Sequence, residues 1–225
     1  MHFGGRNRIF ADRREAGRQL ADLLTRSPPS GASIVLALPR GGVPVGYEVA
    51  RALGADLDVL VVRKIGTPGN PELAAGAIAS GGVTVYNPDV LDMLGLGEQD
   101  LDRVREREVA ELARRDEVYR GTRAAPDVRG RTAVLVDDGI ATGATMDAAV
   151  RAVRQLEPAA VIVAVPTAAS DAVARLRRLA DQVVCVEVPE PYIGVGAWYA
   201  SFPQLTDEEV VSVLEKAQRE RAGPG

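Results

Sequence analysis

Asp137 and Asp138 stand between an apolar run, residues 133–136, and a turn of small and hydroxyl-bearing residues. The apolar run predicts a buried strand, and residues 144–156 have the composition of a helix that follows it. The turn is therefore expected at the carboxyl end of a strand and the amino end of a helix. Open α/β sheets bind ligands there, and backbone N–H groups can hold a phosphate. The turn residues are Ala141, Thr142, Gly143, Ala144 and Thr145.

The two acids limit what such a turn could bind. A carboxylate repels a phosphate, so we expect Asp137 and Asp138 to accept hydrogen bonds from vicinal hydroxyls or to help hold Mg²⁺. A phosphorylated ribose offers both partners. Strands that end in two acids also occur in receiver domains and phosphohydrolases, and a phosphohydrolase would use Asp137 as a nucleophile. Neither a Walker A string nor a dinucleotide-binding glycine motif occurs in the sequence.

A second glycine-rich turn follows the apolar run at residues 34–38 and precedes a helical run at residues 43–53. It consists of Pro39, Arg40, Gly41 and Gly42. The two glycines let the backbone approach a ligand closely, and the arginine supplies positive charge for a diphosphate. By itself this turn is also consistent with an ordinary connection between a strand and a helix.

A third motif begins with a basic pair, Arg63 and Lys64, at the end of the predicted strand 57–63. Residues 65–72, which follow, are rich in glycine and proline. The pair could bind phosphate groups, and the loop could close over a site to exclude water.

Taken in their order along the chain, the three motifs resemble those of the type I phosphoribosyltransferases, which bind 5-phosphoribosyl 1-diphosphate (PRPP) and transfer its ribosyl phosphate to a base. The resemblance implies that Asp137 and Asp138 hold the ribose hydroxyls and Mg²⁺, directly or through water, and are catalytic together with Arg63 and Lys64. It implies a diphosphate site at Pro39, Arg40, Gly41 and Gly42, with a cis peptide between Pro39 and Arg40. It also implies a 5′-phosphate site at residues 141–145 and a mobile flap at residues 65–72.

The acceptor site is expected in residues 187–202, where several aromatic residues stand among prolines and glycines. Trp198 and Tyr199 are the predicted acceptor-binding residues, because aromatic rings stack on flat bases. A hydrophobic plug is the alternative for either ring. Ala141 stands where family members that act on 6-oxopurines have an aspartate, so adenine or uracil is a better candidate than hypoxanthine or guanine.

The predicted fold is α/β: a mainly parallel sheet of the phosphoribosyltransferase type, flanked by helices, with a small hood from the terminal segments. We expect one domain over residues 1–225, with a core at about 31–187, a hood from about 1–30 and 188–225, and a charged helical insertion at about 88–123. The predicted strands are 33–38, 57–63, 132–137, 160–165 and 182–187, and a hairpin is predicted at 74–86. Asp12 with Glu15, and Thr206 with Glu209, have the spacing of capping boxes that begin terminal helices.

Composition excludes several other classes of protein. A formal net charge of −4 argues against nucleic acid as a partner, and no apolar run is long enough to span a membrane. Without a signal-peptide core at the amino terminus, the protein is expected to be cytoplasmic. Cys185 is the only cysteine and His2 the only histidine, which argues against Cys-His or Ser-His-Asp chemistry.

The predicted partners are PRPP and a small nitrogen acceptor, with a homodimer as a further possibility. Two functional classes remain open at this stage. The first is an Mg²⁺-dependent phosphoribosyltransferase of nucleotide salvage. The second is a regulatory protein that binds PRPP without turnover.

Overall fold

The computed structural model describes residues 10–222, except for the side chains of Pro71 and Glu72. His2 and the first residues of the expected hood lie outside the described residues. In the part of the chain that the structure describes, no helix is both long enough and apolar enough to cross a membrane.

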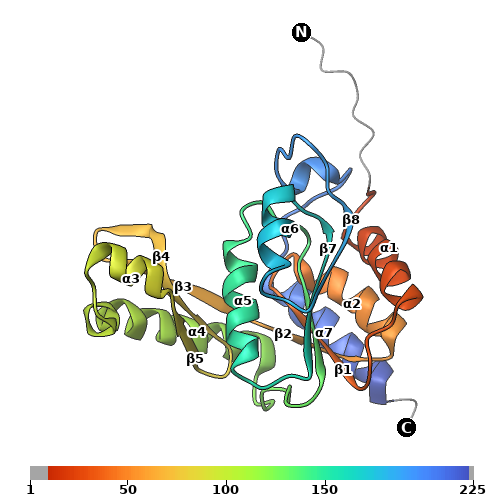
Figure 1. Cartoon of the computed structure of the whole chain (residues 1–225). Helices are drawn as coiled ribbons and strands as arrows, with labels where there is room; N and C mark the ends of the chain where they lie inside the picture. Colours follow the sequence, from red (N-terminus) through yellow and green to blue (C-terminus); the bar gives the residue numbers. More distant parts are fainter. Residues whose placement is uncertain (1–9, 223–225) are drawn as a thin grey trace.

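Five parallel strands form the central sheet in the order β2–β1–β6–β7–β8 (Figure 1). This confirms the predicted, mainly parallel sheet. The strands are β1 (Ser33–Ala37), β2 (Asp56–Val59), β6 (Thr132–Val136), β7 (Ala160–Thr167) and β8 (Gln182–Glu187). Because β1 and β6 are neighbours in the middle of the sheet, the glycine-rich turns that follow them emerge side by side.

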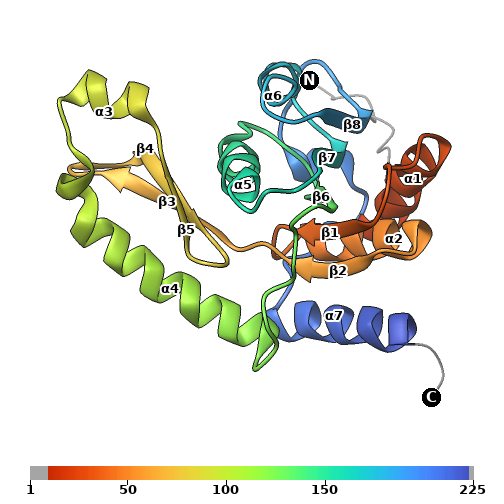
Figure 2. The same cartoon turned by 60° about the horizontal axis from the view of Figure 1, so that its bottom comes forward.

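Helices cover both faces of this sheet (Figure 2). One face carries α1 (Arg13–Arg26), α2 (Gly42–Leu53) and α7 (Asp207–Ala222), and the other carries α5 (Ala144–Arg154) and α6 (Ser170–Leu176). Successive side chains of a strand point to opposite faces. In β1, Val35 and Ala37 accordingly pack under α2, whereas Ile34 and Leu36 belong to the core under α5. Burial on both faces explains the continuous apolar runs in the sequence.

A second lobe projects from the edge of the molecule (Figures 1 and 2). Its antiparallel sheet consists of β3 (Val62–Thr67), β4 (Asn70–Ala79) and β5 (Val83–Tyr86), which confirms the predicted hairpin. Helix α3 (Pro88–Leu94), the 3₁₀ helix η1 (Glu98–Leu101) and α4 (Asp102–Arg120) complete the lobe. Leu101, Leu112 and Tyr119 are buried although the segment around them is highly charged.

The single strand predicted at residues 57–63 is wrong, because two strands of different sheets occupy it. Residues up to Val59 pair with β1, and residues from Val62 pair with β4. At the junction, Leu60 N donates to Ala37 O at 2.9 Å, whereas Val61 N donates to Ser80 Oγ at 2.9 Å. The chain changes sheets within an unbroken apolar run, so composition gives no sign of the change.

The region predicted to be a flap loop, residues 65–72, forms the ends of β3 and β4 and the turn between them. Gly69 has a φ of +81° in this turn, and Thr67 Oγ1 donates to Asn70 O at 3.0 Å. The β3–β4 pairing is irregular around Gly66. Closure of residues 65–72 over the site stays a prediction.

Both terminal helices begin at the predicted capping residues. Glu15 N donates to Asp12 Oδ1 at 2.8 Å, and Glu209 N donates to Thr206 Oγ1 at 3.2 Å. Helices α1 and α7 lie against the α2 face of the sheet, while the segment between β8 and α7 crosses its carboxyl edge (Figure 1). That segment contains the 3₁₀ helix η2 (Val195–Trp198).

Candidate functional site

The turn after β1 touches the acid pair after β6. A Cβ added to Gly41 would lie 1.9 Å from Asp138 Oδ2, and one added to Gly42 would lie 2.6 Å from Val136 O. No residue other than glycine fits at position 41 unless the Asp138 side chain moves, or at position 42 unless the backbone at the end of β6 moves. The peptide between Pro39 and Arg40 is cis, as the resemblance implied.

The two acids are partly buried and held by separate donors. Asp137 Oδ1 accepts a hydrogen bond from Asp138 N at 2.8 Å, and Asp138 Oδ2 accepts one from Arg13 Nε at 2.8 Å. Burial raises the pKa of Asp137 well above its ordinary value, and the adjacent Asp138 raises it further. Burial also raises the pKa of Asp138, against the opposing effect of the Arg13 guanidinium. Asp138 thus has a fixed cation beside it, and Asp137 has its neighbour's backbone N–H.

The predicted 5′-phosphate turn lies at the amino end of α5. Gly143 adopts φ +73° and caps the helix, while Ala141, Thr142, Ala144 and Thr145 are exposed. Exposed backbone N–H groups at a helix start, next to the acids, form the kind of cradle that binds phosphate. Thr142 O accepts a hydrogen bond from the guanidinium of Arg175 in α6.

Arg40, in the predicted diphosphate turn, is directed toward α7. Its Nε lies 3.1 Å from Asp207 Oδ1, and its Nη1 donates to Leu205 O at 2.7 Å. Asp207 also accepts a hydrogen bond from Tyr119 Oη at 2.6 Å. The charge of Arg40 is therefore partly offset in this structure.

Arg63 and Lys64 point to opposite sides of β3, since successive residues of a strand alternate. Arg63 Nη2 lies 2.6 Å from Glu108 Oε2 in α4, and the Glu108 side chain is only 9% exposed. Lys64 instead lines a cavity of about 390 Å³ together with Ala144 and Arg175. Of the two basic residues, Lys64 lies on the side of the phosphate turn.

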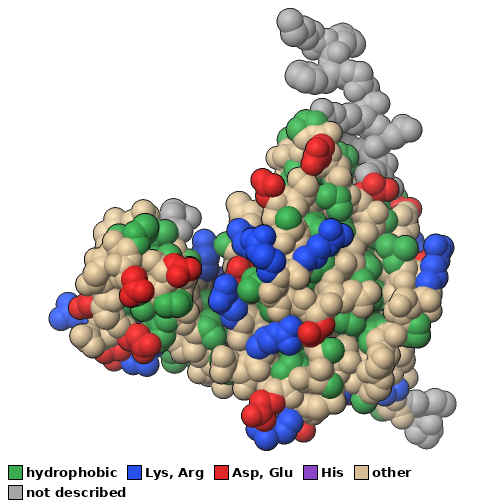
Figure 3. Space-filling model, in the orientation of Figure 1, with side chains coloured by type: hydrophobic (Ala, Val, Ile, Leu, Met, Phe, Trp, Pro, Cys, Tyr) green, Lys and Arg blue, Asp and Glu red, His purple; other side chains and the backbone are tan. Residues whose placement is uncertain are grey.

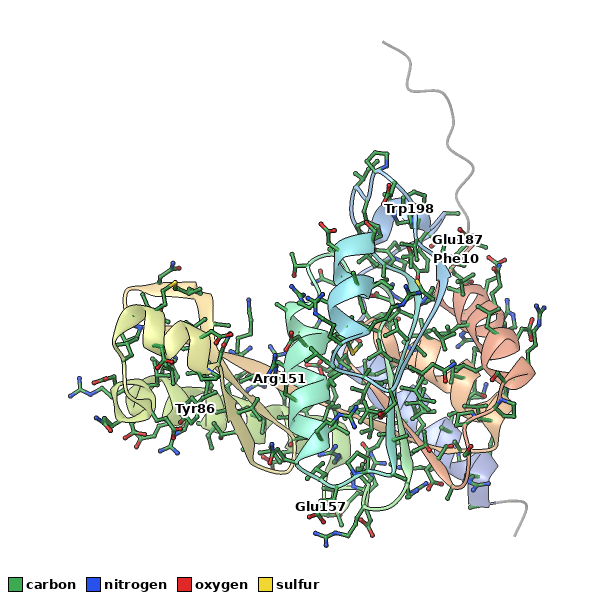
Figure 4. All side chains as sticks on the ribbon, in the orientation of Figure 1. Phe10, Tyr86, Arg151, Glu157, Glu187 and Trp198 are labelled. Carbon is green, nitrogen blue, oxygen red and sulfur yellow. The ribbon has the colours of Figure 1, made fainter. Side chains whose placement is uncertain are left out.

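That cavity lies between the second lobe and α5. Tyr86 and Arg151, labelled in Figure 4, line it from the lobe and from the helix respectively. Lys and Arg side chains gather over α5 and α6 on this face of the molecule (Figure 3). A local positive region therefore exists on a chain whose net charge is −4.

The two predicted acceptor-binding rings have different environments. Trp198 is half-buried and stacks on Tyr192 with ring centroids 6.2 Å apart. Its Nε1 is buried and has no hydrogen-bond partner among the described residues. Tyr199 is only 1% exposed, and its hydroxyl donates to Asp138 O at 2.5 Å. Stacking of a base on Tyr199 stays a prediction that this burial does not favour.

Two residues of the site were missed from the sequence. Arg13 is the first residue of α1, and a cation is unfavourable at a helix amino terminus, so its position was a weak signal of another role. Arg175 stands 33 residues after Thr142, and nothing in its local sequence indicates the contact.

The acids were also tested as a metal site. Within residues 10–222, no three His, Cys, Asp or Glu side chains gather closely enough to hold a metal ion. Mg²⁺ often takes only one or two carboxylates and completes its coordination with water and substrate phosphates. Asp137 and Asp138 fit this donor set, in which the substrate supplies most of the ligands.

Comparisons with known proteins agree with this arrangement. Residues 13–199 match the model of the phosphoribosyl transferase domain. The chain belongs to that family.

Two known proteins are similar to this chain over nearly the whole length of this chain. The crystal structure of TT1426 from Thermus thermophilus superposes with a TM-score of 0.84 at 47% identity, covering 92% of this chain and 98% of that one. The Mycobacterium tuberculosis protein Rv0571c, provisionally named a phosphoribosyl transferase, is 48% identical over 218 residues. The match covers 97% of this chain but 49% of Rv0571c, so the chain spans about half the length of that relative.

Proposed function

We propose that this chain transfers the 5-phosphoribosyl group of PRPP to a nitrogen acceptor, a nucleobase, and releases diphosphate. The contact between Gly41 and Asp138 supports this proposal most directly. It brings a tight glycine turn suited to a diphosphate against a carboxylate suited to sugar hydroxyls. The exposed phosphate turn at the start of α5 adjoins both.

In the proposed reaction, diphosphate leaves the anomeric carbon of the ribose as a nitrogen atom approaches, and positive charge develops on the sugar ring. Asp137 and Asp138 hold the hydroxyls of the ring, and their negative charge stabilises the transition state. The turn at residues 39–42 and Lys64 bind the departing diphosphate. Bound Mg²⁺ would supply additional positive charge to that leaving group.

The acceptor is proposed to lie against Trp198, which lies near Phe10 and near Glu187 at the carboxyl end of β8 (Figure 4). The unpaired Nε1 of this ring can donate a hydrogen bond to a base if the segment shifts. Ala141 offers no carboxylate to an acceptor. This supports adenine or uracil over a 6-oxopurine.

A second candidate function is a PRPP-binding regulator without turnover. The observation that favours it is that acids engage both Arg40 of the predicted diphosphate turn and Arg63, which was predicted to be catalytic. Arg40 contacts Asp207, and Arg63 contacts Glu108. Either protein must release Arg40 from Asp207 before this side chain can bind the diphosphate, whereas a regulator without turnover does not need Arg63 at the reacting centre.

One experiment separates these functions. PRPP with Mg²⁺ is titrated into the protein by calorimetry, and diphosphate release is then measured with a panel of nucleobases and small amines. Acceptor-dependent release supports the transferase and identifies its acceptor. Binding without release supports the regulator. The absence of PRPP binding contradicts both proposals.

A further inference from the structure

Arg13 connects the acid pair to the segment that carries the predicted acceptor site. Its Nε donates to Asp138 Oδ2 at 2.8 Å, and its Nη1 donates to Pro203 O at 2.8 Å. The guanidinium also lies 3.7 Å from the centre of the Phe202 ring. The Arg13 side chain is only 10% exposed, so water competes little for these contacts. A planar guanidinium can make all three at once.

Tyr199 makes a second connection between the same two regions. Its hydroxyl donates to the backbone carbonyl of Asp138 at 2.5 Å, and its ring lies 4.9 Å from that of Phe202. Asp138, Arg13, Phe202 and Tyr199 therefore form a closed ring of contacts. Asp138 cannot shift far without displacing at least one member of that ring.

Trp198 is attached to this ring through the chain itself. It is adjacent to Tyr199, and its backbone carbonyl accepts a hydrogen bond from Phe10 N at 3.1 Å. Ala200 N donates in turn to Phe10 O at 2.8 Å. The residues just before α1 therefore hold both sides of Tyr199, and Arg13 lies three residues after Phe10 in the chain.

We propose that Arg13 is a positioning residue that couples ribose binding at Asp138 to the placement of the acceptor segment around Trp198. The inference rests on the proposed function, in which the hydroxyls of PRPP bind Asp138. When a hydroxyl binds this carboxylate, Asp138 shares its oxygens between the sugar and Arg13. The guanidinium then adjusts against Phe202 and Pro203, and the acceptor segment follows.

The test uses the only tryptophan of the chain as its probe. PRPP with Mg²⁺ is titrated into the full chain, and both the heat of binding and the emission of Trp198 are recorded. In the unaltered protein, emission is expected to change in proportion to the bound PRPP. PRPP that binds without any change in emission overturns the coupling.

Two variants of Arg13 distinguish the contribution of its positive charge from that of its planar guanidinium. Arg13→Gln is expected to weaken PRPP binding about tenfold, because a charge-assisted hydrogen bond to Asp138 is lost, and to abolish the emission change. Arg13→Lys is expected to restore affinity to within roughly threefold but not the emission change, since a lysine lacks the planar fork and stacks poorly. A full emission change in Arg13→Lys overturns the proposed coupling through the guanidinium.

Phe202→Leu provides an independent variant. It keeps the hydrogen bond between Arg13 and Asp138 but removes the ring under the guanidinium. PRPP affinity is expected to stay within about twofold while the emission change falls by at least half, because the cation–π contact with Arg13 and the ring contact with Tyr199 are removed. An undiminished emission change contradicts the proposal even if Arg13→Gln fails to fold.

The matched control is Arg14→Gln, an exposed neighbour on the same helix. It is expected to leave both readouts unchanged, and an equal loss in this control overturns the specific role of Arg13. Failure of the unaltered protein to bind PRPP removes the proposed function itself. Normal PRPP binding with a full emission change in all Arg13 and Phe202 variants removes only the coupling.

Discussion

Gly41 and Asp138 lie in direct contact, 97 positions apart in the chain, because β1 and β6 are adjacent strands of one sheet. Any side chain at Gly41 would overlap the Asp138 carboxylate, since an added Cβ would lie 1.9 Å from Oδ2. The backbone at Gly41, with φ −60° and ψ −33°, is one that any residue adopts. Position 41 therefore requires glycine because the Asp138 carboxylate leaves no room for a side chain, and not because of the backbone conformation of the turn.

Gly41→Ala is expected to reduce PRPP affinity at least tenfold, because the methyl group must displace Asp138 from its hydrogen bond with Arg13. Calorimetric titration measures the loss. Gly54→Ala is the control: Gly54 has φ +60° and open space around it. This control is expected to lower stability by about 1 kcal/mol through backbone strain alone, with unchanged PRPP affinity. Equal affinities in Gly41→Ala and the unaltered protein contradict the assignment of the turn.

Replacing both acids, as Asp137→Asn with Asp138→Asn, is expected to abolish PRPP binding while the protein stays folded. Burial raises the pKa of both acids, which means that the fold is not stabilised by their charge, so neutral amides are tolerated at both positions. Calorimetry measures binding, and circular dichroism confirms folding. Asp22→Asn, on the exposed side of α1, is the control for the loss of an acid. Unchanged PRPP affinity in the double variant would remove the core of the proposed function.

Trp198 and Tyr199 are expected to respond differently to substitution. Trp198→Leu should weaken acceptor binding more than PRPP binding, because the half-buried ring is the one proposed to contact the acceptor. Tyr199→Phe should lower the free energy of unfolding by about 1–2 kcal/mol, since the Asp138 carbonyl loses its donor. Urea denaturation measures the second effect and substrate titration the first. Equal losses of acceptor and PRPP binding in Trp198→Leu would identify that ring as a packing residue.

Arg63 and Lys64 provide a test of which basic residue binds diphosphate. Arg63→Ala is expected to lower the free energy of unfolding by roughly 1–3 kcal/mol, because the buried Glu108 carboxylate loses this ion pair and keeps the exposed Arg107, at 3.3 Å, as its cationic partner. Lys64→Ala is expected to weaken PRPP binding with little change in stability. Unfolding curves and PRPP titrations of both variants make the comparison. A larger binding defect in Arg63→Ala, at equal stability, would reverse the assignment.

Asp56 provides a pH-dependent contribution to stability. The hydrogen bond from Arg131, at 2.6 Å, lowers the pKa of this carboxyl, and Arg221 at 3.2 Å adds to the effect. Because the pKa of Asp56 is lower in the folded than in the unfolded protein, the carboxylate stabilises the fold at pH values above the unfolded pKa of about 4. This stabilisation is lost as the pH falls through the pKa of the folded protein. Asp56→Asn should therefore be less stable than the unaltered protein at pH 7, by at most about 1 kcal/mol for so exposed a pair. Thermal unfolding from pH 7 to pH 2.5 should show the gap closing, and a gap that persists at pH 2.5 contradicts this explanation.

Much of the parallel sheet was predictable because each β-α unit is local in sequence. An apolar run buried on both faces, a glycine turn and a helix follow one another within about twenty residues around Pro39 and again around Asp138. Strand pairing is not local, and this is why the prediction of a single strand at residues 57–63 was wrong. Val59 and Val62 belong to the same kind of apolar run, but their partners, β1 and β4, lie on opposite sides of them in the chain.

The sequence by itself determined the family, the parallel sheet and the positions of the two glycine-containing turns that follow β1 and β6, because each depends on residues that are neighbours in the chain. Only the tertiary structure decided which charged groups meet. Arg13 reaches Asp138 across 125 positions, Arg40 turns to Asp207, and Arg63 turns away to Glu108 while Lys64 faces the phosphate turn. Such pairs form where helices and lobes pack against the sheet edge, so the sequence of any single segment does not predict them.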